Sequence, residues 1–121
     1  MAKVLIVDDS PAQVFTMRSL IESWGHQTIS AENGNEALEI AREEIPDVIL
    51  MDVVMPGMSG FQATRKLSKD LATCRIPVIF VSTKDGEADR VWGMRQGATA
   101  YVTKPVNPDT LLTAISDAIA A

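Results

Sequence analysis

Acidic residues follow two of the most apolar segments of this chain. Asp8 and Asp9 come directly after the run VLIV at 4–7, and Asp52 comes directly after VILM at 48–51. Burying a lone carboxylate is costly unless a cation or hydrogen bonds compensate its charge. Three neighbouring carboxylates also repel one another, and they would partly hold protons unless a cation joined them. The three acids therefore predict a cation site, provided that the fold brings them together.

Two further polar residues follow apolar segments in the same way, Ser82 after VIFV at 78–81 and Lys104 after YVT at 101–103. Carboxylate oxygens suit Mg²⁺, whereas zinc is disfavoured because no Cys or His lies near these positions. Lys104 would add a compact positive charge, and Ser82 would add a hydroxyl donor. Together these groups suit phosphoryl transfer, in which a carboxylate attacks phosphorus and becomes an acyl phosphate. Asp52 is the expected nucleophile because its strand should lie in the middle of the sheet.

Each of these residues also has a purely structural interpretation. Asp8 and Asp9 precede a Ser-Pro pair and could cap a helix, Asp52 could be a turn acid, and Lys104 could be a solvated loop lysine. Taken singly, caps and turns explain these residues as well as a site does. All of them at the ends of neighbouring strands would be a coincidence, so the phosphoryl-transfer interpretation is favoured.

The elements that must position these residues alternate regularly along the chain. Stretches with apolar residues three and four apart, typical of amphipathic helices, separate short β-type runs at 4–7, 28–30, 48–51, 78–81 and 101–103. This alternation predicts a parallel sheet with right-handed crossovers.

The strand compositions predict the order of the strands. The runs at 28–30 and 101–103 contain Thr, Ser and Tyr and are expected at the sheet edges, whereas the other three are solidly apolar. The result is a doubly wound, flavodoxin-like (βα)5 fold of class α/β, with strand order 2-1-3-4-5 and helices on both faces. Ligands bind such sheets at the carboxyl ends of the strands, where the acids, Ser82 and Lys104 would meet.

Helix limits are also readable. Ser-Pro at 10–11 and Asn-Pro at 107–108 are typical helix starts, and Gly25 and Gly97 stand where helices should end. Apolar stripes are expected to face the core, among them Ala63, Thr64, Leu67 and Leu71 in the third helical stretch and Ala88, Val91 and Trp92 in the fourth. The alternative for the fourth stretch is a helix that Gly93 makes prone to local melting.

Composition limits the function classes. The 121 residues fit one domain, 1–121, with no separate output domain, and the net charge of −5 argues against nucleic-acid binding. No apolar run exceeds four residues, which argues against a membrane span, and the first residues leave no room for a signal peptide. Cys74 is the one cysteine, so no internal disulfide can form and we expect a cytoplasmic protein. It lies far in sequence from the one histidine, His26, which disfavours a thiol enzyme. We expect a monomer by default.

Four motifs, VLIVDDS, DVILMDVVMPGMSG, PVIFVST and GATAYVTKPV, resemble the receiver domain of two-component response regulators. They occur in the order and spacing of that family and extend the resemblance over essentially the whole chain. The chain resembles stand-alone, CheY-like receivers. Its segments FQATRKLSKD and IPVIFVSTKDGEADRVWGMRQGA are more narrowly similar to regulators of twitching motility, a chemotaxis-like pathway that controls type IV pili.

The resemblance implies a role for each matching residue. Asp52 would be the aspartate that accepts the phosphoryl group. Asp9 and Asp52 would ligate Mg²⁺ directly together with the backbone carbonyl of Val54, and Asp8 would hold the metal largely through water. Lys104 would pair with the acyl phosphate, and the peptide bond between Lys104 and the following proline would be cis.

The resemblance also implies a switch and its partners. Ser82 would be the switch hydroxyl and Tyr101 the switch aromatic, which fills space left when Ser82 shifts toward the phosphoryl group. A histidine kinase or its phosphotransfer domain would donate the phosphoryl group. A downstream protein would bind the face formed by the fourth helix, fifth strand and fifth helix. Such a protein is a signalling module that catalyses only its own phosphorylation and dephosphorylation.

Three positions depart from the family's commoner residues: Ser82 where Thr is usual, the bulkier Thr83, and Val54 where many relatives carry a polar residue. Val54 predicts slow self-dephosphorylation. It also disfavours an aspartyl-phosphate phosphatase, because such enzymes commonly carry a second acid at that position. A flavodoxin-like cofactor module is disfavoured because the acids at 8–9 would repel a phosphate. A phosphate sink or relay intermediate remains open.

Overall fold

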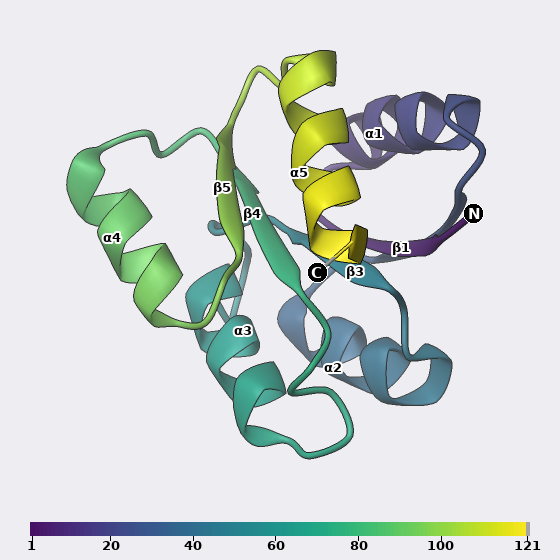
Figure 1. Cartoon of the computed structure of the whole chain (residues 1–121). Helices are drawn as coiled ribbons and strands as arrows, with labels where there is room; N and C mark the ends of the chain where they lie inside the picture. Colours follow the sequence, from purple (N-terminus) through teal and green to yellow (C-terminus); the bar gives the residue numbers. More distant parts are fainter. Residues whose placement is uncertain (121) are drawn as a thin grey trace.

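The computed structural model describes residues 1–120 as a five-stranded sheet with five helices (Figure 1). The strands are β1 (Lys3–Val7), β2 (Gln27–Ala31), β3 (Val48–Met51), β4 (Val78–Ser82) and β5 (Ala100–Thr103). The helices are α1 (Pro11–Ser23), α2 (Gly34–Glu44), α3 (Gly60–Lys69), α4 (Glu87–Arg95) and α5 (Pro108–Ala120). Within residues 1–120, no helix has both the length and the apolar character needed to cross a membrane.

All strand pairs are parallel, and the order is β2-β1-β3-β4-β5, so the predicted topology and both edge strands are confirmed. Successive side chains of a strand point to opposite faces, which explains why the middle strands are apolar throughout. In β1, for example, Val4 and Ile6 pack with α1 and α5, whereas Leu5 and Val7 pack with α2 and α3. Figure 1 shows α4 beside β5, at the edge of the sheet.

Local signals set the helix limits. Ser10 caps α1 by accepting a hydrogen bond from the Gln13 backbone N–H, and Asn107 accepts from the two N–H groups at the start of α5. The expected glycines follow α1 and α4 with φ of 89° and 106°, a left-handed conformation that favours glycine. The capping box that begins α3 at Ser59 was not predicted.

The expected apolar stripe of the fourth helical stretch is wrong, and that of the third is partly wrong. Trp92 is 48% exposed, Val91 is 46% exposed and Ala88 is also exposed, so these side chains lie outside the core. The reason is the position of α4 beside the edge strand, where Gly93 is the buried residue of the helix. Leu71 is also exposed because α3 ends at Lys69, before that residue.

Candidate functional site

Backbone hydrogen bonds between the strands continue one residue beyond the strand ends, and they position the acids. Val7 lies opposite Met51 in the register, which brings the residues that follow them, Asp8 and Asp52, to the same edge. The Asp52 N–H donates to the Val7 carbonyl at 2.9 Å, and the Asp8 N–H donates to the Ala31 carbonyl at 3.1 Å. The predicted convergence at the carboxyl edge therefore follows from the pairing of parallel strands.

The three predicted acids lie together. One carboxylate oxygen from each of Asp8, Asp9 and Asp52 falls within 4.8 Å of the other two. Asp8 is 2% exposed and Asp52 is 8% exposed, whereas Asp9 is open to solvent. Asp8 also accepts a hydrogen bond from the Ser10 backbone N–H at 2.9 Å, so the capping interpretation holds for this residue in addition to its place in the cluster.

Lys104 reaches the same cluster from the end of β5. Its N–H continues the β4–β5 pairing by donating to the Ser82 carbonyl at 2.8 Å. Its Nζ lies 2.8 Å from Asp8 Oδ2 and 3.7 Å from Asp52 Oδ1, so the shorter ion pair is with Asp8. The peptide bond to Pro105 is cis, as expected.

The electrostatics of the cluster leave room for a cation. Burial raises the pKa of Asp52, and Asp8 and Asp9 raise it further, whereas Lys104 and the Val53 backbone N–H lower it. The balance is upward, so the attraction of Lys104 does not offset the burial of Asp52 together with the repulsion from its two acidic neighbours. The all-oxygen donor set is the kind that Mg²⁺ prefers, and these residues fit such an ion.

The loop after β3 brings α3 unusually close to Asp52. The Gly60 N–H donates to the Val53 carbonyl at 2.9 Å, and a Cβ at Gly60 would overlap the Asp52 carbonyl oxygen. Only glycine fits this approach. Sequence reasoning missed Gly60, although a glycine directly after a helix-capping serine was the available signal. Val54, two residues after Asp52, has an exposed side chain.

The two predicted switch residues are linked through one backbone segment. Ser82 is fully buried at the end of β4, and its Oγ accepts from the Lys84 N–H at 3.1 Å. The Tyr101 hydroxyl donates to the Lys84 carbonyl at 2.6 Å, so Tyr101 already reaches the loop that follows Ser82. Burial raises the pKa of Tyr101, and the nearby Ser82 hydroxyl and Arg90 offset part of this increase. No sequence pattern marks Lys84, because its contacts with Ser82 and Tyr101 are made by backbone groups.

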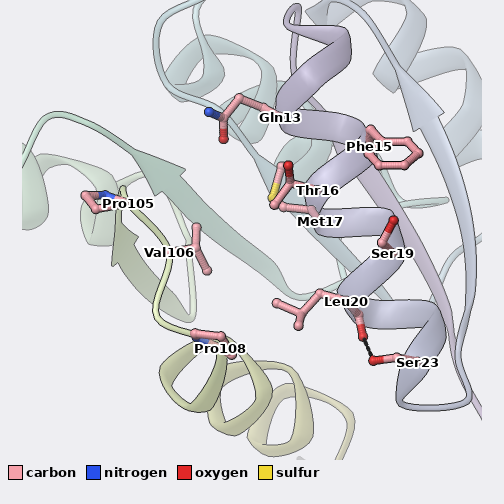
Figure 2. Close-up of a pocket in the computed structure, with 10 residues that line it drawn as sticks. All are labelled: Gln13, Phe15, Thr16, Met17, Ser19, Leu20, Ser23, Pro105, Val106 and Pro108. Atoms are coloured by element: carbon pink, nitrogen blue, oxygen red, sulfur yellow. Dashed lines mark hydrogen bonds between the residues drawn. The ribbon is translucent and has the colours of Figure 1, made fainter.

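A groove of about 640 Å³ lies between α1 and the segment before α5. Figure 2 shows Met17 and Leu20 of α1 on one side and Val106 and Pro108 on the other. Pro105, the residue after Lys104, lines the same groove, and so does the exposed Gln13 of α1, whereas the Phe15 ring points away from it (Figure 2).

Comparison with known proteins agrees with this geometry. The chain is 56% identical over 120 residues to the protein PilH of Pseudomonas aeruginosa, with 99% of both chains covered. It is 40% identical over 106 residues to the response regulator PleD of Caulobacter vibrioides, of which it spans 23% of the length. Among solved structures, the chemotaxis protein CheY4 of Vibrio cholerae matches with a TM-score of 0.91 at 33% identity, over 98% of both chains.

The family pattern described as response regulator receiver domain matches residues 4–116 of the chain. The sequence motifs, the strand order and the relatives therefore agree. The chain belongs to the response regulator receiver domain family.

Proposed function

We propose that this receiver domain is a phosphorylation-dependent switch in which Asp52 accepts a phosphoryl group from a histidine kinase or its phosphotransfer domain. The observation that carries the proposal is the convergence of Asp8, Asp9 and Asp52 with Lys104 at one edge of the sheet. Three acids and one lysine would repel a negatively charged phosphoryl group. The site can accept such a group only after a further cation has bound. Mg²⁺ is that cation in this proposal.

The transfer is an in-line substitution at phosphorus. An Asp52 carboxylate oxygen forms a bond to phosphorus while the phosphorus–nitrogen bond of the donor phosphohistidine breaks, and the imidazole leaves with the electron pair. Lys104 balances charge on the phosphoryl oxygens as it moves from Asp8 toward the new group. Asp8, Asp9, Asp52 and the Val54 carbonyl would hold Mg²⁺, which supplies positive charge to those oxygens.

The switch begins at Ser82. Its hydroxyl accepts from the Lys84 N–H, which leaves its own hydrogen free to donate to a phosphoryl oxygen. One hydrogen bond to a charged group contributes about 1.5–3 kcal/mol, which shifts a two-state population by roughly 10- to 100-fold. The change reaches Tyr101 through the Lys84 segment and shifts an existing equilibrium of the face formed by α4, β5 and α5.

The same face supplies the proposed output surface. Val91, Trp92 and Met94 of α4 are 46–48% exposed, an unusual density of apolar side chains for one short helix. The identity to PilH supports a downstream protein in the control of twitching motility. A phosphate sink or relay is the second possibility within the same chemistry, and it would require no downstream partner on this face.

The groove between α1 and α5 is the proposed contact surface for the phosphohistidine protein, because Pro105, the residue next to Lys104, lines it. Gln13→Ala, at an exposed side chain that lines the groove, should slow transfer from a phosphohistidine protein. It should leave labelling by acetyl phosphate unchanged, because a small donor needs no protein contact. Equal slowing with both donors would contradict the assignment of the groove.

The test of the proposed function is labelling with acetyl phosphate, with and without Mg²⁺, followed by intact mass. The wild-type chain should gain one phosphoryl group only with Mg²⁺. Asp52→Asn should gain none, and Asp117→Asn, at an exposed acid on α5, should behave as the wild type does. Labelling of Asp52→Asn at the wild-type rate would exclude the proposal.

A further inference from the structure

Arg90 of α4 makes three contacts with the strand that carries the switch tyrosine. Its Nη2 donates to Thr103 Oγ1 at 2.6 Å, and its Nη1 donates to the Tyr101 carbonyl at 3.4 Å. The centre of its guanidinium group lies 5.3 Å from the centroid of the Tyr101 ring, within the range of a cation–π interaction. One side chain therefore holds both the ring and the backbone of the tyrosine.

The Tyr101 ring is also confined on its inner side. It lies against Phe80, with ring centroids 6.0 Å apart, and Phe80 in turn packs edge-on against Phe61. Gly93, one turn after Arg90, allows α4 to approach this cluster, because a Cβ there would lie 3.2 Å from Tyr101 Cδ2. The ring thus has packing partners on its inner side and a charged partner in Arg90, and its hydroxyl is bonded to the Lys84 carbonyl.

We propose that Arg90 is a positioning residue that stabilises the orientation of Tyr101 in which its hydroxyl meets the Lys84 carbonyl. The inference rests on the proposed function, in which Ser82 must present its hydroxyl to the phosphoryl group. The Lys84 N–H orients the Ser82 hydroxyl and the Lys84 carbonyl holds Tyr101, so a factor that fixes Tyr101 also fixes Ser82. Arg90 thereby increases the rate of phosphoryl transfer by positioning Tyr101 and Ser82, and it does not itself contact the donor.

An ordinary exposed arginine is the competing explanation. Isolated surface contacts of arginine often contribute little to stability. Here, however, the planar guanidinium combines a stacked ring with two hydrogen-bond acceptors on the same strand, which a flexible ammonium cannot reproduce. Arg95, on the same helix and also exposed, has no such contact among the residues described, and it serves as the matched control.

The first experiment observes the ring directly. Tyr101 is the one tyrosine of the chain, so protein made with ring-labelled ¹³C-tyrosine gives a single set of aromatic NMR signals. Arg90→Ala should shift or broaden these signals and lower the population of the observed ring orientation by about 2- to 5-fold. In Arg90→Lys the signals should lie nearer to their wild-type positions than in Arg90→Ala, and in Arg95→Ala they should not move. Unmoved signals in Arg90→Ala would overturn the proposal.

The second experiment measures coupling to the site. The rate of labelling by acetyl phosphate with Mg²⁺ should fall by about 2- to 5-fold in Arg90→Ala. In a Tyr101→Ala background, Arg90→Ala should have no further effect, because the partner through which it acts is gone. An equal fall in both backgrounds, or no fall in either, would overturn the role assigned to Arg90. Failure of the proposed function is distinguishable, since the wild-type chain would then remain unlabelled while the NMR comparison stayed readable.

Discussion

The ammonium group of Lys104 lies nearer to Asp8, at 2.8 Å, than to Asp52, at 3.7 Å. The proposed phosphoryl acceptor is therefore the less well compensated of the two buried acids, and burial with the neighbouring carboxylates raises its pKa. In the proposed transfer, Lys104 leaves Asp8 and moves to an oxygen of the phosphoryl group on Asp52. The raised pKa also implies that the charge of Asp52 has a measurable effect on the stability of the folded protein.

Removing the charge of Asp52 should stabilise the metal-free protein. Asp52→Asn removes the desolvation and the repulsion from Asp8 and Asp9, which outweigh the attraction of Lys104. Thermal unfolding without Mg²⁺ at neutral pH should therefore show a higher midpoint than the wild type. Added Mg²⁺ should raise the wild-type midpoint much more than that of Asp52→Asn, because binding to the folded state alone stabilises it. A lower midpoint for the metal-free variant would contradict this electrostatic account.

Gly60 should tolerate no side chain. In Gly60→Ala the new Cβ would overlap the Asp52 carbonyl oxygen, so α3 or the Asp52 backbone must move. Overpacking of this kind costs about 1–3 kcal/mol of unfolding free energy. Chemical denaturation should show that loss together with weaker Mg²⁺ binding. Gly86→Ala is the comparison, because a Cβ there meets only the Asp89 side chain, and it should change Mg²⁺ binding little.

Val54 should make the phosphorylated form long-lived. Its apolar side chain is exposed beside the acidic cluster and offers no group that could orient a water molecule toward phosphorus. Val54→Asn and Val54→Glu should each shorten the half-life of the phosphorylated chain, measured by loss of the phosphoryl mass after removal of the donor. If the wild type loses its phosphoryl group faster than both variants, this explanation of the half-life is wrong.

Tyr101 should titrate above the ordinary tyrosine pKa of about 10. Burial is the main cause of its raised pKa, and Asp89 adds to it, so the folded state favours the protonated phenol. This group therefore contributes stability that is fully present below the unfolded pKa and is lost as pH rises through the folded pKa. The phenolate absorbance of this single tyrosine gives the midpoint. A folded midpoint at or below that of the chain unfolded in guanidinium would disagree.

Much of this architecture was predictable because the local signals agree. Apolar runs fix the middle strands, edge polarity fixes the strand order, and parallel pairing then places Asp8, Asp52 and Lys104 at one edge. Ser10 and Asn107 cap their helices through side-chain oxygens, a signal that the sequence displays directly.

Other features depend on packing that sequence patterns do not encode. Val91 and Trp92 have helical spacing typical of a core stripe, yet their helix lies beside an edge strand and leaves them exposed. The preference of Lys104 for Asp8 is a matter of side-chain conformation. Lys84 contributes only its peptide groups, and Arg90 could not be distinguished from other exposed arginines until its contacts were known.

The central claim is that the acidic edge makes Asp52, and no other residue, a reversible carrier of a phosphoryl group. It is tested most directly by treating the chain with acetyl phosphate and Mg²⁺, reducing the acyl phosphate with borohydride, and locating the resulting homoserine by peptide mass spectrometry. We expect homoserine at position 52 alone, and none when Mg²⁺ is omitted. Homoserine at Asp8 or Asp9 in place of Asp52, or none with Mg²⁺ and donor in excess, would contradict the account.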